Sequence, residues 1–347
     1  MKIEEIKYIY FLGIGGIGMS ALARYFLKAG KKISGYDRTS TVLTKTLESE
    51  GMEIHYTEDV TLVPDNIDIV IFTPAIPKNN VEYAHVLDKD LPIYKRSEVL
   101  GMISKEKKTI AVAGTHGKTT TCSIISYLLK NSGIDISSFV GGIMKNFDSN
   151  YLYGKSEWIV AEADEYDRSF LRLFPDVAVI LSMDADHLDI YGNKESLKKG
   201  FQDFTLNIKD GGSLWIHESL IQQISVEWKR ALDRKGISVN LFGIDNGDMQ
   251  ATNIRVVDGK FHYAIKVDEE IDGFELGLGG RHNVSNAVVA TAVAKELGCT
   301  WDDLKESIQS FTGIKRRFEI VAKKDKAVLI DDYACLLYTS PSPRDRG

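Results

Sequence analysis

Two glycine-rich loops, each set between an apolar run and a helical pattern, constrain the fold of this chain most strongly. The first loop, GIGGIG at residues 13–18, follows the apolar run YIYFL and precedes the helix-like segment MSALARYFLKAG. The second loop, GTHGK at residues 114–118, follows TIAVA and precedes another helical pattern. A strand, a glycine loop and a helix in this order begin a βαβ unit. Two such units predict an α/β fold with parallel sheets.

The length of 347 residues predicts two or three domains. A charged stretch at residues 105–108 has the composition of a linker. Further secondary structure is expected as strands at 67–77, 91–97, 157–164 and 176–189, a β-rich segment at 211–280, and helices at about 282–297 and 301–311. We predict a Rossmann-like N-terminal domain at 1–105, a P-loop-type central domain at 106–316, the start of a third domain at 317–334, and a tail at 335–347.

Composition limits the kinds of partner. Hydrophobic residues make up 44% of the chain and charged residues 27%, as is typical of a soluble globular protein. The net charge of -6 leaves no basic surplus for binding nucleic acid, and we expect no such partner. No apolar run approaches the roughly 20 residues needed to span a bilayer, so we expect a cytoplasmic protein with no membrane partner. The three cysteines lack C-x-x-C spacing, so neither a disulfide framework nor a zinc site is expected.

The first loop has the spacing G-x-G-x-x-G at Gly13, Gly15 and Gly18, and Asp37 ends the next predicted strand. Glycines at these positions let backbone N–H groups approach a diphosphate at the N-terminus of a helix. The motif alone leaves three alternatives open. These are a nicotinamide or flavin site, a site for another diphosphate, and a turn with only a structural role.

The second loop carries the residues that phosphoryl chemistry requires. Lys118 can neutralise the charge of the β- and γ-phosphates, and the hydroxyl of Thr119 can bind Mg²⁺. The strict P-loop spacing would place a glycine at Val112, so this is a shortened variant. The alternative is a glycine-rich turn with an incidental lysine.

Magnesium needs further oxygen ligands. Glu162 ends the predicted strand in VAEAD, and His187 follows the next strand, so both are expected at the same sheet edge as the phosphate loop. On their own, His187 would be a hydrogen-bonded structural histidine, and Asp164, Glu165 and Asp167 a solvated loop. Three neighbouring strand ends that all offer ligands instead predict an ATP–Mg²⁺ site.

Five segments together resemble the Mur ligase family, namely FLGIGGIGMSALA, AGTHGKTTT, VAEADEYD, DADHLDIY and GRHNVSNA. The resemblance runs from about Ile9 to Ala334 and is greatest to the members that add L-alanine to UDP-N-acetylmuramate. It implies ATP-dependent ligation through an acyl-phosphate intermediate in the synthesis of peptidoglycan precursors. A rival within the family is the recycling ligase that attaches a preformed tripeptide to the same sugar; GIGGIGMSA favours the alanine enzyme.

The resemblance also implies roles for individual residues. The diphosphate of UDP-N-acetylmuramate, instead of a dinucleotide, would lie at Gly13, Gly15, Gly16 and Gly18, with Asp37 toward the uridine. ATP would contact Gly114, Thr115, His116, Gly117, Lys118, Thr119, Thr120, His282, Asn283, Asn286 and Asp332. Mg²⁺ would be bound by Thr119, Glu162 and His187, and the catalytic residues would be Lys118, Glu162, His187 and Arg317. The alternatives are an ordinary helix start with an Asn cap at GRHN and a solvated basic face at 315–317.

The end of the chain departs from the family pattern. After IDDYA, family members continue with a His-His-Pro sequence and a third domain that closes on ATP and helps bind the amino acid, whereas here residues 335–347 are CLLYTSPSPRDRG. Such a short segment cannot form a domain. We expect this tail to be foreign sequence joined to a truncated chain with little or no ligase activity. The alternatives are a natural two-domain protein and a non-catalytic nucleotide-binding fragment.

Overall fold

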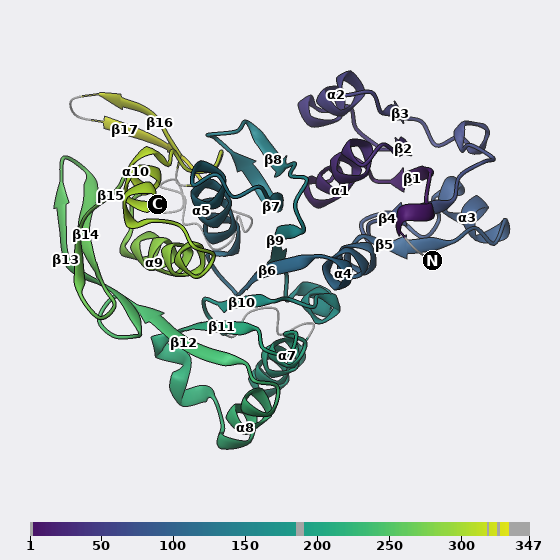
Figure 1. The fold of residues 1–347 in the computed structure, drawn as a ribbon. Coiled ribbons are helices and arrows are strands. Elements are labelled where there is room, and N and C mark those ends of the chain that lie inside the picture. The colour runs from purple at the N-terminus through teal and green to yellow at the C-terminus, as the bar shows by residue number, and fades with distance from the viewer. Residues whose placement is uncertain (1–2, 185–190, 318, 325–326, 333–347) are drawn as a thin grey trace, which may run out of the picture.

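The computed structural model describes residues 3–184, 191–317, 319–324 and 327–332. Its strands form two large sheets and one small hairpin (Figure 1). The larger sheets are mainly parallel, which confirms the predicted α/β class. No helix among these residues has the length and apolar character needed to cross a membrane.

The N-terminal sheet has five parallel strands in the order β3-β2-β1-β4-β5. Its strands are β1 (Tyr8–Leu12), β2 (Lys32–Tyr36), β3 (Glu53–His55), β4 (Ile69–Phe72) and β5 (Ile93–Lys95). The helices that connect them are α1 (Ile17–Lys28), α2 (Val42–Ser49), α3 (Val81–Asp88) and α4 (Arg96–Glu106), with short 3₁₀ turns η1 (Ile3–Glu5) and η2 (Val60–Leu62). This is the doubly wound arrangement expected of a Rossmann-like domain.

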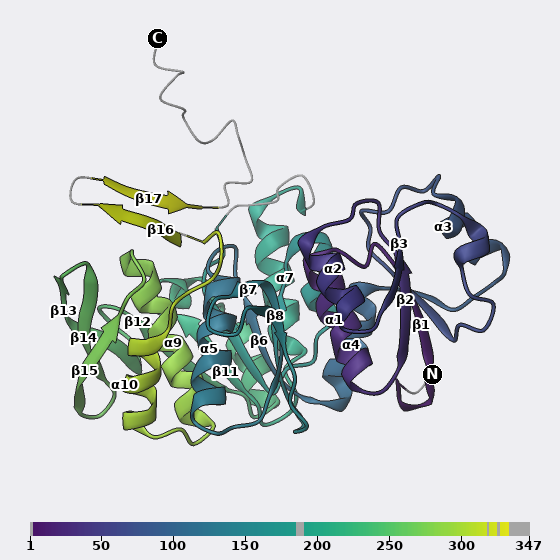
Figure 2. The same ribbon diagram turned by 90° about the horizontal axis from the view of Figure 1, so that it is seen from above.

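Both faces of this sheet are covered, which explains the uninterrupted apolar sequence of β1. Ile9 and Phe11 pack into one hydrophobic cluster together with residues of α1 and α4. Tyr10 and Leu12 point to the opposite face and pack with Val86 of α3. In Figure 2, α1 and α4 accordingly lie on the side of the sheet facing the rest of the molecule, and α3 lies on the far side.

The second sheet has ten strands in the order β15-β14-β13-β12-β11-β10-β6-β9-β7-β8. These are β6 (Lys108–Ala113), β7 (Ser137–Met144), β8 (Ser149–Leu152), β9 (Trp158–Ala163), β10 (Val177–Ile180), β11 (Ser213–His217), β12 (Ser238–Gly243), β13 (Met249–Val257), β14 (Lys260–Lys266) and β15 (Glu270–Leu276). The strands from β13 to β7 in this order pair in parallel, whereas β8, β14 and β15 join by antiparallel pairing.

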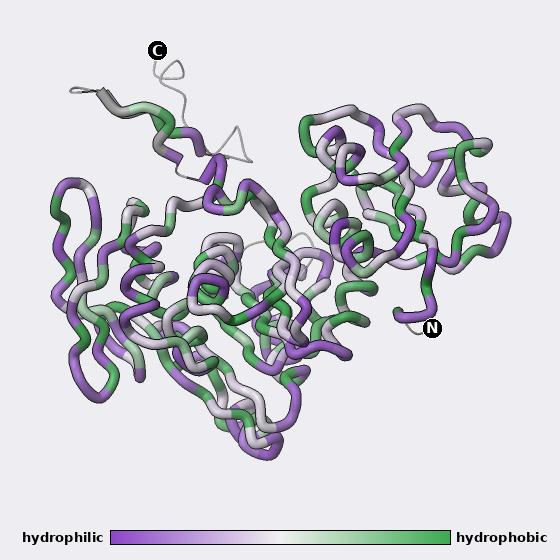
Figure 3. Tube along the Cα trace, turned by 45° about the horizontal axis from the view of Figure 1, so that its top comes forward, coloured by the Kyte–Doolittle hydropathy of each residue, from purple (hydrophilic) through white to green (hydrophobic). Residues whose placement is uncertain are grey.

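Helices cover both faces of this sheet as well. They are α5 (Lys118–Asn131), α7 (Lys194–Leu206), α8 (Val226–Arg234), α9 (Arg281–Glu296) and α10 (Trp301–Ser310), with 3₁₀ turns η3 (Tyr166–Arg172) and η4 (Glu218–Gln223). Ile110 and Val112 of β6 pack with α5 and α9, whereas Ala111 of the same strand packs into the cluster that contains Phe201 of α7. Hydrophilic segments lie along many of the outer loops (Figure 3).

Two segments differ from the sequence-based expectation. The charged stretch 105–108 is hardly a linker, because α4 continues to Glu106 and β6 begins at Lys108. The region 211–280 is β-rich as predicted but also contains α8, whose amphipathic pattern was missed. The apolar run 327–330 has the pattern of a strand and forms β17 (Ala327–Asp331), which pairs among the described residues with β16 (Glu319–Lys324) in a hairpin standing apart from the larger sheets (Figure 2). The tail from Cys335 lies outside the described residues.

A buried polar contact joins the N-terminal sheet's helix α1 to strand β8 of the second sheet. The side-chain amide of Asn150, which is fully buried, donates to Ile17 O at 2.6 Å and to Ser20 Oγ at 3.0 Å. Its carbonyl accepts from Nη1 of Arg24 at 2.5 Å, while the other guanidinium nitrogens of Arg24 bind Glu50. This contact fixes α1, and thus the first glycine loop, against the second sheet.

Replacing Asn150 with alanine should lower the free energy of unfolding by about 1–3 kcal/mol, because buried hydrogen-bonding groups of Arg24 and Ile17 would lose their partner. Urea denaturation measures this loss. The exposed Asn246 provides a control, and Asn246→Ala should leave the stability nearly unchanged. Equal stabilities of the two variants would contradict the importance of the contact.

Candidate active site

The second glycine loop lies where β6 ends and α5 begins, as predicted. Gly117 caps α5 in a left-handed conformation with φ of 83°, and Gly114 has φ of 135°. A side chain at Gly114 would also collide with the backbone, since its Cβ would lie 2.9 Å from Ser182 N. Both positions therefore require glycine. The loop leaves the N-terminus of α5 open, which suits it for binding phosphate.

Three neighbouring strands deliver polar side chains to this sheet edge. β6 pairs in parallel with β10 on one side and with β9 on the other, so their carboxyl ends meet. The loop after β10 is tied to the glycine loop because the Thr115 hydroxyl lies 2.8 Å from that of Ser182, and Ser182 Oγ accepts from His116 N at 3.1 Å. The predicted convergence of three strand ends is thus present.

A cavity of about 330 Å³ opens beside this loop. It gathers residues from three distant parts of the sequence, namely the glycine loop, the start of α9 and the C-terminal segment. Its lining consists of Thr115, His116, Gly117, Lys118, Thr119, Thr120, His282, Asn283, Asn286, Arg317 and Asp332. Every residue predicted to contact ATP therefore lines this one cavity, except Gly114, which lies behind it in the loop.

The start of α9 is not the simple Asn cap considered as an alternative. The residue that caps the helix is Gly280, and no side chain bonds there. Asn283 instead donates to Gly279 O at 2.6 Å and accepts from Asn286 Nδ2 at 3.2 Å. A Cβ at Gly117 would lie 3.0 Å from Asn286 Oδ1, so this asparagine packs directly against the glycine turn.

Lys118 makes an ion pair that sequence reasoning missed. Its ammonium donates to Gly114 O at 2.8 Å and to both carboxylate oxygens of Glu165, at 2.7 and 3.0 Å. Glu165 is fully buried, so the alternative of a solvated loop does not hold for this residue. The hydroxyl of Tyr191 donates to Glu165 O at 2.7 Å and helps to hold the loop. The apolar residues after the acidic run, including the buried Phe170 and Leu173, are a sequence signal that this loop folds inward.

This ion pair should appear as a coupling in a double-mutant cycle. Lys118→Met removes the ammonium that donates to both oxygens of the buried Glu165 carboxylate and should destabilise the ligand-free protein by about 3–5 kcal/mol. Adding Glu165→Gln removes the charge of that carboxylate and should restore roughly 1–3 kcal/mol of the lost free energy of unfolding. Urea unfolding of the wild type, both single variants and the double variant measures the coupling. Strictly additive effects would show that the pair contributes nothing.

Glu162 and Thr119 lie together at the floor of the site. Glu162 is the fifth residue of β9, and its Oε1 accepts from Gly141 N of β7 at 2.5 Å. Burial raises the pKa of Glu162, while hydrogen bonds from Gly141 N–H and the Thr119 hydroxyl act in the opposite direction. A cation bound beside this carboxylate would compensate the unfavourable burial of its charge.

The residues present fit a magnesium ion. A hydroxyl and a carboxylate oxygen are the hard ligands that Mg²⁺ prefers, and Mg²⁺ commonly takes its other ligands from water and substrate phosphates. Within the described part of the chain, no group of three or more His, Cys, Asp or Glu side chains is placed to bind a metal. The third predicted ligand, His187, lies outside the described residues.

The first glycine loop connects β1 to α1. Gly13 has φ of 86° and donates to Tyr36 O at 2.8 Å, which holds the loop over the end of β2. Asp37 accepts from Gly15 N at 2.7 Å and from Thr39 N at 3.1 Å, so its carboxylate is part of the loop. Side chains at Gly13 and Gly15 would come within 2.6 Å of Thr73 and Thr44. The loop is therefore tightly packed, as its glycines predict.

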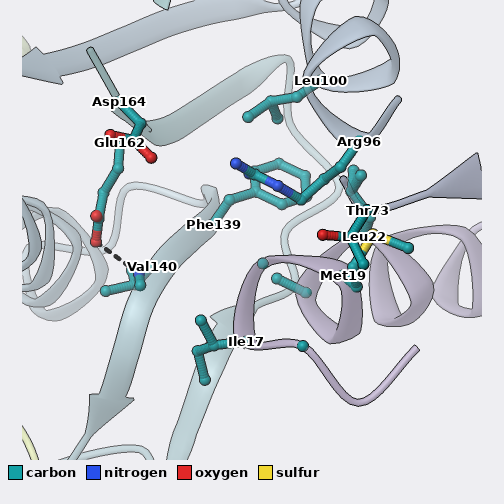
Figure 4. A pocket seen from close by; sticks show the side chains of 14 residues that line it. Ile17, Met19, Leu22, Thr73, Arg96, Leu100, Phe139, Val140, Glu162 and Asp164 are labelled. Atoms are coloured by element: carbon teal, nitrogen blue, oxygen red, sulfur yellow. Dashed lines mark hydrogen bonds between the residues drawn. The ribbon is translucent and has the colours of Figure 1, made fainter. Parts of the chain in front are cut away.

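A second cavity, of about 280 Å³, lies between this loop and β9 (Figure 4). Gly16, Ile17 and Gly18 line one side, and Glu162 and Asp164 line the other. Gly13, Gly15 and Asp37 do not line it and lie in the body of the loop. Glu162 faces this cavity, whereas its hydrogen-bonding partner Thr119 lines the cavity beside Lys118. The two cavities therefore meet at the Glu162–Thr119 pair.

Two family descriptions match the sequence over most of its length. Residues 8–108 match "Mur ligase family, catalytic domain", and residues 112–294 match "Mur ligase middle domain". The chain belongs to the Mur ligase family. Because both matched descriptions are of Mur ligases, the nicotinamide or flavin alternative for the first glycine loop is not supported. Mur ligases are ATP-dependent, in agreement with the phosphate-binding character of the second loop.

Curated relatives of this Mur ligase include proteins named UDP-N-acetylmuramate–L-alanine ligase. The protein from Christiangramia forsetii is 44% identical over 339 residues, which cover 96% of this chain and 72% of the relative. The protein from Flavobacterium johnsoniae is 43% identical with the same coverage.

Solved structures with the same fold include two kinds of Mur ligase. UDP-N-acetylmuramate-alanine ligase from Thermotoga maritima has a TM-score of 0.80 at 27% identity, covering 95% of this chain and 74% of that protein. UDP-N-acetylmuramate:L-alanyl-gamma-D-glutamyl-meso-diaminopimelate ligase from Neisseria meningitides has a TM-score of 0.76 at 26% identity, covering 90% and 100%. The fold therefore does not distinguish the amino acid from the peptide as substrate.

Proposed function

We propose that this Mur ligase catalyses the ATP-dependent ligation of L-alanine to UDP-N-acetylmuramate. The observation that carries the proposal is the meeting of two cavities at Glu162 and Thr119. One cavity begins at the first glycine loop and suits a nucleotide sugar, and the other surrounds the second glycine loop and suits ATP. A carboxylate at the end of the sugar would thus approach the terminal phosphate of ATP.

The reaction would proceed in two steps. A carboxylate oxygen of the muramate attacks the γ-phosphorus, the bond from phosphorus to the ADP oxygen breaks, and an acyl phosphate forms. The amine of alanine then attacks the acyl carbon, loses a proton and expels phosphate, which leaves an amide. No side-chain nucleophile is required, because the carboxylate and the amine supply the electron pairs.

The side chains would act by charge and position. Lys118 would exchange part of its contact with Glu165 for phosphate oxygens, and Arg317 would add positive charge from the C-terminal side of the cavity. Thr119 and Glu162, together with His187, would hold Mg²⁺, which neutralises phosphate charge where two anions must meet. His282, Asn283 and Asn286 would contact the adenine, and Asp332 the ribose. Because both ATP and nucleotide sugars are cytoplasmic metabolites, a cytoplasmic location belongs to the proposal.

The choice of L-alanine over a tripeptide is supported by sequence relatives. The eight curated proteins at 40–44% identity are all named as alanine ligases. A tripeptide ligase remains the second candidate because the Neisseria structure shares the fold.

The direct test is mass spectrometry of the product formed at high enzyme concentration from ATP, UDP-N-acetylmuramate and either L-alanine or the tripeptide. Any product that this chain forms, in the low amount expected from its sequence, is predicted to be UDP-N-acetylmuramoyl-L-alanine with equimolar phosphate, and neither should form when any substrate is omitted. The C. forsetii relative provides a positive control. Product formed only with the tripeptide would overturn the choice of alanine. Absence of product, together with absence of binding of both nucleotides, would overturn the function.

A further inference from the structure

Arg96 is a charged residue at the substrate cavities for which the motifs give no role. It is the first residue of α4, directly after the edge strand β5, and it is half-buried. Figure 4 shows its side chain extending from α4 into the first cavity, with the guanidinium pointing across the cavity toward the side where Glu162 and Asp164 lie. It also lines a neighbouring, wider cavity of about 600 Å³, together with Thr73 and Lys95. Arg96 thus stands at the junction of two cavities.

Arg96 has no direct ion-pair partner among the described residues, although Glu162 and Asp164 line the same cavity. Across the residues that the structure describes, no carboxylate lies within 4.0 Å of its guanidinium, and it makes no hydrogen bond. Its basic neighbours differ in this respect. Lys95 lies 3.5 Å from Asp167, and Arg172 lies 3.1 Å from Glu98 of α4 itself. The guanidinium of Arg96 is half-buried, and its five N–H donors make no hydrogen bond to the described residues. Such a group favours an anionic ligand whose oxygens accept two of these hydrogen bonds at once.

The third glycine of the first loop makes room for this guanidinium. Gly18 has an ordinary backbone conformation, so its φ does not demand glycine. A Cβ there would instead lie 3.0 Å from Arg96 Cδ and 3.1 Å from Arg96 Nη1. In dinucleotide folds the corresponding glycine allows close packing of helix and strand. Here it lets an arginine approach the N-terminus of α1.

The position of Arg96 identifies which part of an elongated ligand it meets. A nucleotide sugar consists of a nucleoside and a sugar joined by a diphosphate, and cavities of about 300–1,000 Å³ are typical for ligands of this kind. The part of such a ligand that lies at the junction of the two cavities is therefore its central diphosphate. Planar guanidinium groups bind phosphate oxygens in a bidentate manner, and the start of α1 contributes further positive potential.

We propose that Arg96 binds the diphosphate of the nucleotide-sugar substrate, and that the absence of a side chain at Gly18 leaves space for its guanidinium in that position. The proposal rests on the proposed function, since the ligand is the UDP-sugar of that reaction. It assigns the diphosphate to a side chain from α4 in addition to the backbone of the glycine loop. Glu162, which lines the first cavity but not the wider one, stays free for the end of the sugar that reacts.

Calorimetric titration of the full chain with UMP, UDP, UDP-N-acetylglucosamine and UDP-N-acetylmuramate tests this assignment. Arg96→Gln should lower the affinity for the three ligands that contain a diphosphate by a similar factor of roughly 10 to 100, because charge-assisted hydrogen bonds to the second phosphate are lost. The affinity for UMP should fall by less. Arg172→Gln, which removes an exposed arginine paired to the same helix, should leave all four affinities unchanged. Unchanged MgATP binding verifies that the Arg96 variant is folded.

Gly18→Ala provides a second variant that keeps the arginine but displaces its guanidinium. It should lower the affinity for the same three UDP compounds. Three results would overturn the proposal. One is unchanged affinity of Arg96→Gln for UDP. Another is a loss confined to UDP-N-acetylmuramate, which would place Arg96 at the carboxylate. The third is failure of the wild type to bind any UDP compound, and only this result would also overturn the proposed function.

Discussion

Lys118→Ala is expected to weaken MgATP binding by roughly 10- to 100-fold and to lower any ligation rate by about 100- to 1,000-fold. The ammonium is the only side-chain cation that the described glycine loop holds at the start of α5, and its three donors already point to Gly114 O and Glu165. Phosphate oxygens would take over some of these donors. Fluorescence titration with a labelled ATP analogue measures the affinity.

Two further variants control for other causes of weak MgATP binding. Lys118→Ala leaves a buried charge at Glu165, so the double variant with Glu165→Gln is tested as well and should also bind MgATP weakly. Lys130→Ala removes an exposed lysine of the same helix, whose ammonium lies 3.3 Å from Asp135. It should bind MgATP like the wild type. Normal MgATP affinity in the double variant would show that Lys118 does not contact the nucleotide.

Glu162→Gln is expected to remove most of the effect of Mg²⁺ on ATP binding, with a loss of at least about 10-fold in affinity at saturating Mg²⁺. The substitution keeps the shape of the side chain and the acceptor for Gly141 N, but it removes the negative charge next to Thr119. Affinity for ATP in EDTA should change little. Glu157→Gln, at an exposed glutamate paired with Lys108 just before β9, is the control.

The pH dependence of the Mg²⁺-dependent gain in ATP affinity should differ between the wild type and Glu162→Gln. Burial raises the pKa of Glu162, so a larger fraction of this carboxyl is protonated in the folded protein than in an exposed glutamate at the same acidic pH. Metal binding needs the ionised form. The Mg²⁺-dependent gain in ATP affinity should therefore rise with pH above the ordinary range of a carboxyl group, and this component should be absent in Glu162→Gln. Identical profiles would contradict a metal role for Glu162.

Local signals in the sequence were sufficient for much of this fold. Each glycine loop lies between the strand and the helix that its motif requires, and β6, β9 and β10 are adjacent as their apolar runs predict. The lining of the cavity beside Lys118 was also foreseen, because the resemblance to Mur ligases carried over whole motifs. Those motifs placed Asn283 and Arg317 beside a loop more than 160 residues away in the sequence.

The residues that were missed act through tertiary contacts without a sequence motif. Glu165 has the same composition around it as a solvated acidic loop, and only the inward path of residues 164–170 buries it against Lys118. Arg96 follows an unremarkable edge strand, and its location depends on how α4 packs beside α1. Asn150 has no local signal either, since its partners Ile17, Ser20 and Arg24 belong to the other sheet's helix.

Competitive calorimetry of this chain with UDP-N-acetylmuramate, ATP–Mg²⁺ and NADH tests the central claim most directly, namely that the two adjacent cavities bind a nucleotide sugar and ATP together. The account predicts that UDP-N-acetylmuramate and ATP–Mg²⁺ each bind at one site per chain, that both bind simultaneously, and that NADH displaces neither. Binding of NADH in place of the UDP-sugar, or mutually exclusive binding of the UDP-sugar and ATP, would contradict it.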